Sequence, residues 1–293
     1  MKEMGAIMKQ LALIWVVLLL SACAGNPSVE DGVTEPPLSV EEQFQQAEQN
    51  RAQGKYGEAL GGYAPLTERD DEWALRSKLA IAQMMLDQGR NQEALRAFNL
   101  ILEEAPEDVG ALEGRGLARL ALGDAEVASS QLLKVNQAEP GRWRTLNGLG
   151  VAADMTGDFA AAARWYGEAL QAGGERPMVI NNAGYSLIMA GEYREAEQLL
   201  ERGTLRFPNE SRLNHNLAIA QARQGHYNDA MRTWRKTMDR VEALNNAGYI
   251  AKLNGDTEKA RTFFDEAVAI STRYRPTVDA NLRSLDGGAV SAK

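Results

Sequence analysis

The chain has 293 residues, of which 44% are hydrophobic and 25% charged, and its formal net charge is −8. This apolar content is sufficient for a helical core, and the length suits either two ordinary domains or one repeat protein. The acidic balance excludes the broad cationic surface that phosphate binding requires, so we expect no nucleic-acid partner. The single cysteine, Cys23, excludes an intramolecular disulfide.

Residues 1–22 are predicted to form a secretory signal peptide. Two lysines precede an apolar run from Leu11 to Leu20, which is shorter than the about 20 apolar residues that a transmembrane helix requires. The run ends in Leu20-Ser21-Ala22-Cys23, which resembles a bacterial lipobox with its apolar residue, two small residues and cysteine. This resemblance implies cleavage before Cys23, lipidation of its thiol and attachment to a membrane through the lipid.

The residues after the cysteine predict which membrane holds the lipid anchor and how long the tether is. Ala24 stands where an aspartate is the familiar signal for retention in the inner membrane, so the resemblance implies the outer membrane, on its periplasmic face. Residues 23–39 are predicted to be the lipidated cysteine and a disordered tether, because the stretch is rich in Pro, Ser, Gly and acidic residues. Its residues after the cysteine span roughly 50 Å when fully extended, at about 3.3 Å each.

From residue 40 onward, a period of 34 residues organises the chain. Five glycines follow this spacing and each has an alanine five positions later: Gly89, Gly123, Gly157, Gly191 and Gly225, with Ala94, Ala128, Ala162, Ala196 and Ala230. Gly54 and Gly255 extend the series. Such a period is typical of stacked helical hairpins. We predict hairpins one to seven at about 40–74, 75–108, 109–142, 143–176, 177–210, 211–240 and 241–274.

The fifth hairpin shows how one repeat is expected to fold. Its first helix stops at Gly191, because glycine adopts the left-handed conformation that ends a helix at little steric cost. Its second helix starts near Tyr193 and carries Ala196 where the two antiparallel helices cross, with Gly184 on the opposite helix. Pro208 blocks continuation of the second helix. After the seventh hairpin, the segment from Thr277 to Leu285 predicts a short capping helix, and residues 286–293 a disordered tail.

These glycine, alanine and aromatic positions resemble the tetratricopeptide repeat (TPR), over nearly the whole chain after residue 40. The aromatic positions of that repeat are held by Tyr56, Phe159, Tyr193, Tyr227, Phe98, Tyr166, Trp234 and Phe264. The resemblance implies an all-α fold, a TPR solenoid that forms a right-handed superhelix of about seven hairpins with a C-terminal capping helix at 40–285. Stability is then expected from the stacking of neighbouring hairpins.

Two features depart from the repeat. Arg115 stands in the third hairpin where a core leucine is usual. The sixth hairpin is four residues short and lacks its terminal proline, which we expect to change how it stacks on the seventh hairpin.

Polar residues on the first helices of hairpins four to seven predict a partner-binding groove. Solenoids bind partners on the concave surface that these helices line. Asparagine offers both a donor and an acceptor to a peptide backbone, and the sequence Asn-Asn-Ala-Gly-Tyr occurs at 181–185 and again at 245–249. The predicted partner-binding residues are Asn147, Asn181, Asn182, Tyr185, Arg212, His215, Asn216, Arg223, Asn245, Asn246, Tyr249 and Lys252.

Two roles remain open for the polar members of this set. In the first, the amides pair with an extended or helical peptide, the tyrosines supply apolar contact, and Arg212, Arg223 and Lys252 pair with carboxylates of the partner. In the second, the asparagines serve packing between hairpins and the cations are ordinary surface charges.

Motifs for catalysis and metal binding are lacking. The chain has two histidines, and it contains no HExxH, CxxC or Walker sequence and no Ser-His-Asp order. The glycines at 148 and 150 imitate part of a dinucleotide fingerprint, but no strand is predicted before them. We therefore expect neither enzyme activity nor a cofactor or metal.

Lipobox, tether and repeats together resemble the TPR lipoproteins that serve pilus and secretion machines. The segments 179–196 and 216–230 most resemble the TadD family of the Tad (tight adherence, Flp pilus) assembly systems. This resemblance implies a pilotin-like role, in which the protein binds the secretin subunit and helps it to reach or assemble in the outer membrane. The alternatives are a type IV pilus pilotin, a generic periplasmic scaffold for cell-wall or outer-membrane biogenesis, and the targeting subunit of an enzyme complex.

Overall fold

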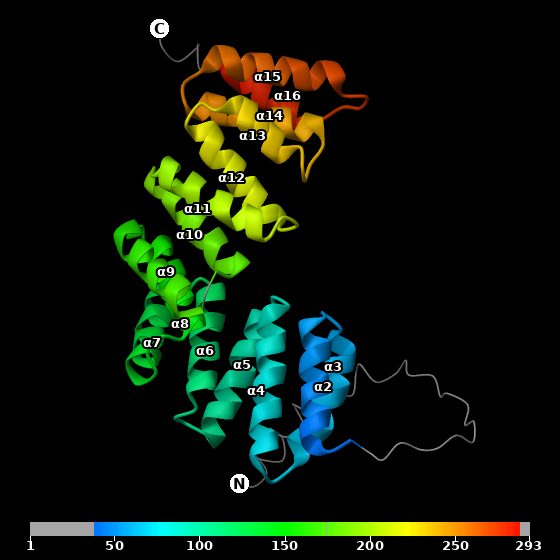
Figure 1. Ribbon diagram of the computed structural model, residues 1–293, viewed down its shortest axis with the longest axis vertical. Coiled ribbons are helices and arrows are strands. Elements are labelled where there is room, and N and C mark those ends of the chain that lie inside the picture. Colours follow the sequence, from blue (N-terminus) through cyan, green and yellow to red (C-terminus); the bar gives the residue numbers. More distant parts are fainter. Residues whose placement is uncertain (1–37, 174, 288–293) are drawn as a thin grey trace, which may run out of the picture. The chain divides into compact units, whose positions relative to one another are not determined.

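The computed structural model describes residues 38–173 and 175–287, which form fifteen α-helices, one short 3-10 helix and no strand (Figure 1). The prediction of an all-α fold is therefore confirmed. The chain divides into an N-terminal unit up to Pro106 and a C-terminal unit from Glu107, and each is described by itself. The predicted signal peptide, Cys23 and nearly all of the tether lie outside the described residues, as does the segment 288–293. Among the helices described, none has the length and apolar character of a membrane span.

The N-terminal unit contains the first two hairpins. Its elements are α2 (Val40–Ala52), α3 (Tyr56–Tyr63), the 3-10 helix η1 (Ala64–Glu68), α4 (Glu72–Asp87) and α5 (Asn91–Glu104). Helix α2 begins at the predicted residue because Ser39 and Glu42 form a capping box. The predicted start of the second hairpin at 75 is three residues late. Asp71 accepts a hydrogen bond from the Trp73 amide at 3.1 Å and so starts α4 earlier.

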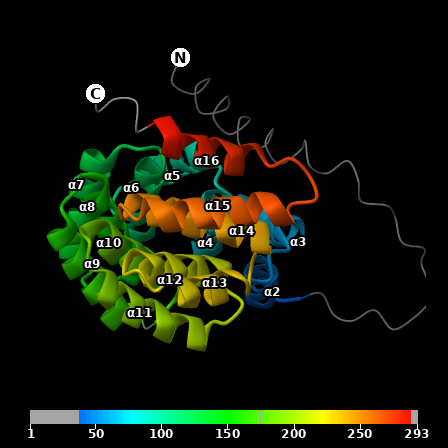
Figure 2. The same ribbon diagram turned by 90° about the horizontal axis from the view of Figure 1, so that it is seen from above.

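The C-terminal unit contains hairpins three to seven and a final helix. Its helices are α6 (Val109–Ala121), α7 (Ala125–Ala138), α8 (Trp143–Met155), α9 (Phe159–Gly173), α10 (Pro177–Ala190), α11 (Tyr193–Arg206), α12 (Ser211–Arg223), α13 (Tyr227–Trp234), α14 (Arg240–Leu253), α15 (Thr257–Ile270) and α16 (Pro276–Gly287). Each even-numbered helix from α6 to α14 is the first of a hairpin, and the second helix of one hairpin packs on the first helix of the next. Helices α7 to α11 lie along an arc in Figure 2.

The repeated glycines end the first helices as predicted. Gly191 has a φ angle of +85° and forms the left-handed C-cap of α10. The other six turn glycines also have positive φ angles: Gly54, Gly89, Gly123, Gly157, Gly225 and Gly255. An L side chain rarely adopts this conformation, so the period of 34 residues marks the places where the chain reverses direction.

A second set of glycines lets the two helices of a hairpin approach each other. A Cβ atom at Gly184 would lie 2.6 Å from Leu200, and one at Gly248 would lie 2.6 Å from Phe264. Ala196 is fully buried on the helix opposite Gly184. The predicted close crossing in the fifth hairpin is therefore confirmed.

The sixth hairpin is shorter than the others because its second helix ends early. Helix α13 has 8 residues, whereas α11 and α15 have 14 each. It ends at Trp234, which is fully buried in a core cluster with Ala230, Ala247 and Phe264. The chain then reaches α14 through the short connection 235–239.

The C-terminal helix caps the seventh hairpin. It runs from Pro276 to Gly287, slightly beyond the predicted segment. Val278 is buried in a cluster with Leu244 and Ala267, and Leu282 packs against the cluster that contains Phe264. The predicted capping helix is therefore confirmed.

Arg115, the departure in the third hairpin, lies on α6. Its Nε atom is buried and has no hydrogen-bond partner among the described residues. Burial lowers the pKa of this guanidinium, and the nearby charge of Arg119 lowers it further. Arginine at this position therefore leaves a buried polar atom unpaired, which destabilises the packing, whereas a leucine would not.

Candidate partner-binding surface

Four of the predicted asparagines form a continuous chain of side-chain hydrogen bonds in the C-terminal unit. Asn216 Nδ2 on α12 donates to Asn181 Oδ1 on α10 at 3.0 Å. Asn181 Nδ2 donates to Asn182 Oδ1 at 3.3 Å, and Asn182 Nδ2 donates to Asn147 Oδ1 on α8 at 3.1 Å. This asparagine ladder (Asn147, Asn181, Asn182 and Asn216) links the first helices of three successive hairpins.

The same type of bond recurs at the C-terminal end of the stack. Asn281 Nδ2 on α16 donates to Asn245 Oδ1 on α14 at 2.8 Å. Asn281 was not predicted, because α16 is not a complete repeat, although its spacing of 36 residues from Asn245 is close to the 35 residues between the partners in the ladder. The amides therefore do hold hairpins together, which is the packing role left open by the sequence.

The ladder is interrupted between α12 and α14. His215 stands 34 residues after Asn181, at the position where a further amide would continue the series. The ring of His215 packs at a tilt against Trp234, with 6.4 Å between ring centroids, and burial lowers the pKa of its imidazole. Asn246 on α14 donates instead to Met238 Sδ at 3.4 Å. The interruption thus replaces amide pairs by a ring contact and a weak bond to sulfur.

An open hollow of about 520 Å³ lies at this interruption. It is lined by Asn181, Ser211, Arg212, His215, Asn216, Thr237 and Met238. Thr237 and Met238 belong to the short connection after α13. Arg212 is exposed and, within residues 38–173 and 175–287, has no hydrogen-bond or ion-pair partner.

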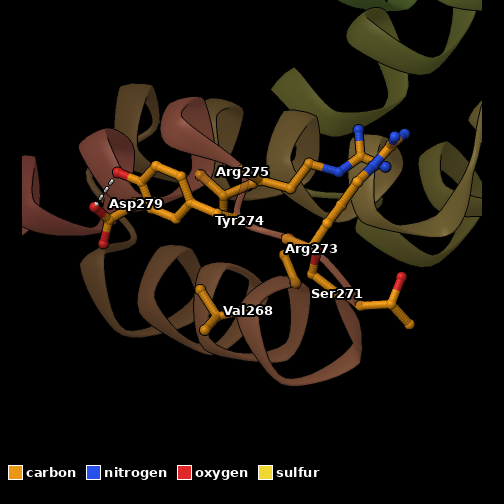
Figure 3. A pocket seen from close by; sticks show the side chains of 9 residues that line it. Val268, Ser271, Arg273, Tyr274, Arg275 and Asp279 are labelled. Atoms are coloured by element: carbon orange, nitrogen blue, oxygen red, sulfur yellow. Dashed lines mark hydrogen bonds between the residues drawn. The ribbon is translucent and has the colours of Figure 1, made fainter.

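A second hollow of about 350 Å³ lies where α15 ends and α16 begins (Figure 3). Several of its polar groups have partners within the protein. Tyr274 is turned toward Asp279 and donates to its Oδ2 atom at 3.1 Å, and Ser271 Oγ donates to the Arg273 carbonyl at 2.5 Å. Arg275 pairs with Asp239 at 2.9 Å. These contacts attach the start of α16 to the rest of the unit.

The predicted tyrosines lie at the surface, about one turn beyond the asparagines. Tyr185 on α10 is 48% exposed and Tyr249 on α14 is 46% exposed. Met178 and Met189, which the repeat pattern did not single out, are also about half exposed and share helical spacing with Tyr185. We call Met178, Tyr185, Met189 and Tyr249 the apolar stripe. Methionine side chains adapt to irregular surfaces, and tyrosine combines an apolar ring with a polar tip.

Two of the three predicted cations have contacts within the protein. The guanidinium of Arg223 lies 4.9 Å from the ring centroid of Tyr193 and donates a hydrogen bond to its hydroxyl. Lys252 Nζ donates to Ser284 Oγ on α16 at 2.7 Å. Of the three, Arg212 is the one whose charge faces a hollow.

Two carboxyl groups on the first helices were missed because each has a partner in the next hairpin. Glu113 on α6 is buried and accepts hydrogen bonds from Thr145 at 2.5 Å and from Arg142 at 2.9 Å. Asp154 on α8 accepts from Ser186 at 2.5 Å and from Tyr166 at 2.8 Å. Glu113 raises the pKa of Arg142, and burial raises the pKa of Asp154. The contacts between first helices are thus polar along much of the unit.

Replacing Asp154 by asparagine is expected to change the pH dependence of stability. Because its pKa is raised in the folded state, the folded chain holds this proton more tightly than the unfolded chain does. The stability that follows from the raised pKa of Asp154 is fully present below the ordinary Asp pKa of about 3.9. It is lost as the pH rises past the pKa that Asp154 has in the folded protein. The free energy of unfolding of the wild type minus that of Asp154→Asn should therefore fall between acid and neutral pH. Urea unfolding over a pH series measures it, with Asp265→Asn at an exposed position of α15 as control. A difference that rises with pH would contradict the assignment.

The described residues contain no group of three or more His, Cys, Asp or Glu side chains placed to hold a metal ion. The glycine pair that imitates a dinucleotide fingerprint lies inside α8. A Cβ atom at Gly148 would meet Leu117 and Leu132, and one at Gly150 would meet Tyr166. The repeat packing therefore explains both glycines.

Comparisons with known proteins agree with this architecture. Family models described as tetratricopeptide repeat match residues 44–109, 79–135, 113–177 and 181–237, and a further one matches 241–274. No curated protein sequence matches the chain.

Solved structures with a similar fold include three bacterial proteins. A tetratricopeptide repeat protein from Parabacteroides merdae is 17% identical, with a TM-score of 0.52 over 84% of this chain and 98% of that chain. PilF from Pseudomonas aeruginosa is 15% identical, with a TM-score of 0.55 over 73% and 97%. A thermophilic TPR protein from Thermus thermophilus is 17% identical, with a TM-score of 0.50 over 67% and 100%.

At these identities the likeness to solved structures is one of fold. The repeat models, by contrast, match well over half of the chain. Repeats of this kind present extended surfaces for binding other proteins and are in general not catalytic. The chain belongs to the tetratricopeptide repeat family and has the architecture of a protein-interaction scaffold.

Proposed function

We propose that this chain is an outer-membrane-anchored TPR lipoprotein that assists assembly of a Tad/Flp-type pilus secretion system, as a pilotin-like protein for the secretin. The proposal has two parts. Lipid on Cys23 attaches the protein to the outer membrane, and the first helices of hairpins four to seven bind a segment of the partner.

The binding part rests on one observation, the apolar stripe beside the asparagine ladder. Tyr185 and Tyr249 occupy equivalent positions of two repeats, and each leaves nearly half of its surface exposed. Covering such side chains removes apolar area from water, which stabilises a complex by about 25 cal/mol per Å² before the costs of association. Amides and hydroxyls next to the stripe supply hydrogen bonds that orient the bound segment.

The proposed location in the outer membrane and the proposed partner are both inferred from the sequence. Leu20-Ser21-Ala22-Cys23 followed by Ala24 supports an outer-membrane lipoprotein. The likeness of 179–196 and 216–230 to the TadD family supports a secretin as the partner. A general periplasmic scaffold, or a type IV pilus pilotin, would use the same anchor and the same surface with a different partner.

Crosslinked capture of the lipidated protein from its native envelope tests the proposal. Secretin is expected among the proteins captured with the wild type. In a strain that carries Cys23→Ser, secretin is expected to be depleted from the outer membrane because the anchor is lost. Capture of cell-wall enzymes in place of secretin, with secretin correctly located in the Cys23→Ser strain, would contradict the pilotin role.

A further inference from the structure

Two connections between helices lie side by side at one edge of the C-terminal unit. Residues 235–239 join α13 to α14, and residues 271–275 join α15 to α16. Arg275 of the second connection pairs with Asp239 of the first at 2.9 Å, and it lies 3.7 Å from Glu242 at the start of α14. The two connections therefore form one continuous surface, which we call the basic edge.

The basic edge carries three cations without partners. Arg235, Lys236 and Arg273 are exposed, and their side chains have no hydrogen-bond or ion-pair partner in the described part of the chain. The carboxylate within the edge, that of Asp239, is already paired with Arg275. The side chains of Arg273 and Arg275 extend to the same side of their connection (Figure 3). The edge thus has an excess of positive charge, in a chain whose net charge is −8.

Exposed apolar groups accompany these cations. Tyr274, within the second connection, is 71% exposed, and Ile270, the last residue of α15, is 37% exposed. The Tyr274 hydroxyl donates to Asp279 at 3.1 Å, which fixes the position of the ring. A tyrosine has an apolar ring and a polar tip, and such side chains are enriched where proteins lie at a boundary between water and lipid. A lipid surface offers phosphates to the cations and an apolar layer to Tyr274 and Ile270.

We propose that the basic edge contacts the surface of a membrane that contains anionic phospholipids. Its three unpaired cations pair with headgroup phosphates, and Tyr274 and Ile270 enter the boundary between headgroups and acyl chains. The inference rests on the proposed function in one respect, because lipid on Cys23 would hold the chain close to such a surface. It also goes beyond that function, since a tether of roughly 50 Å would by itself let the folded units stand away from the membrane.

Vesicle binding by an unlipidated chain tests the inference. A chain of residues 23–293 with Cys23→Ser carries no lipid, and it contains every helix described. This chain is expected to co-sediment with vesicles of phosphatidylethanolamine and phosphatidylglycerol in equal parts. It is not expected to bind vesicles in which neutral phosphatidylcholine replaces the anionic phosphatidylglycerol. Binding should weaken as the salt concentration rises, because exposed charges are screened.

The triple variant Arg235→Gln, Lys236→Gln, Arg273→Gln is expected to weaken vesicle binding about a hundredfold, since each cation near an anionic surface contributes a factor of about five. The matched control variant has the same net charge and should bind as the unchanged chain does. It replaces three exposed cations that lie outside the edge, on α7, α9 and α11: Lys134→Gln, Arg164→Gln and Arg194→Gln. Circular dichroism verifies that both variants fold.

The orientation of the bound chain can be measured in the same background. Because Cys23 is the only cysteine of the chain, Cys23→Ser allows one polarity-sensitive dye to be attached at a chosen residue. A dye on Thr272→Cys, within the edge, should shift its emission to the blue on anionic vesicles. The same dye on His226→Cys, at the opposite end of α13 from the edge, should not shift.

Failure to bind the anionic vesicles, or equal binding by the triple variant and its control, would overturn the inference. A dye response at residue 226 in place of residue 272 would also contradict it. If vesicles are not bound and the triple variant loses a protein from the envelope capture, the edge is a protein interface instead. The vesicles contain no secretin and the chain no lipid, so this test can fail while crosslinked capture of secretin succeeds, and the reverse also holds.

Discussion

Replacing Asn181, Asn182, Asn245 and Asn246 together by alanine is expected to lower the free energy of unfolding by about 3–5 kcal/mol and to abolish partner binding. The four changes remove four amide–amide hydrogen bonds and one bond to sulfur. Each bond contributes about 1 kcal/mol, and the nearly buried amide of Asn216 is left without its acceptor. Urea unfolding followed by tryptophan fluorescence and circular dichroism measures the loss.

A matched variant separates packing from binding. Tyr185→Ala with Tyr249→Ala removes exposed side chains that contribute no bond to the ladder, so binding should be lost while the unfolding midpoint changes little. If the fourfold asparagine variant unfolds at the wild-type urea concentration, the ladder does not stabilise the stack. If the tyrosine variant binds the partner as tightly as the wild type, the apolar stripe is not the binding surface.

The hairpins were predictable from the sequence because each helix end depends on local chemistry. A residue with positive φ is nearly always glycine, so Gly191 and its equivalents mark the ends of first helices wherever they stand. The helix start at Glu72 was placed three residues late, because the cap on Asp71 depends on which side chain turns back to the backbone. Local signals thus fix the repeat and leave a few boundaries open.

The roles of the polar residues were less predictable, because they depend on contacts between hairpins. An asparagine offers the same groups to a neighbouring amide as to a peptide, so the sequence alone does not separate the two roles of Asn181. The carboxyl group of Asp154 meets Ser186 only after two hairpins have stacked. The hollow at His215 likewise requires the early end of α13, whose four missing residues were visible in the sequence but whose effect on the lining was not.

Alanine substitutions at Gly248 and Gly167 are expected to change stability in opposite directions, although both glycines lie inside helices. A Cβ atom at Gly248 would lie 2.6 Å from the ring of Phe264, which is fully buried. Overpacking of this kind costs about 1–3 kcal/mol. At Gly167 on α9 an added Cβ would meet nothing within 4 Å, so alanine should stabilise the protein by up to about 1 kcal/mol through its helix propensity. Urea unfolding of both variants gives the two signs.

A double-mutant cycle then identifies the cause of the loss at Gly248. Phe264→Ala alone is expected to cost about 3–5 kcal/mol, because it removes a fully buried ring. In that background Gly248→Ala should cost almost nothing, since the atoms that the new methyl group would meet are gone. An equal cost with and without the ring would mean that the glycine serves another purpose. The predicted coupling would explain why a glycine faces a large side chain again at Gly150 with Tyr166 and at Gly184 with Leu200, where the two helices of a hairpin approach each other.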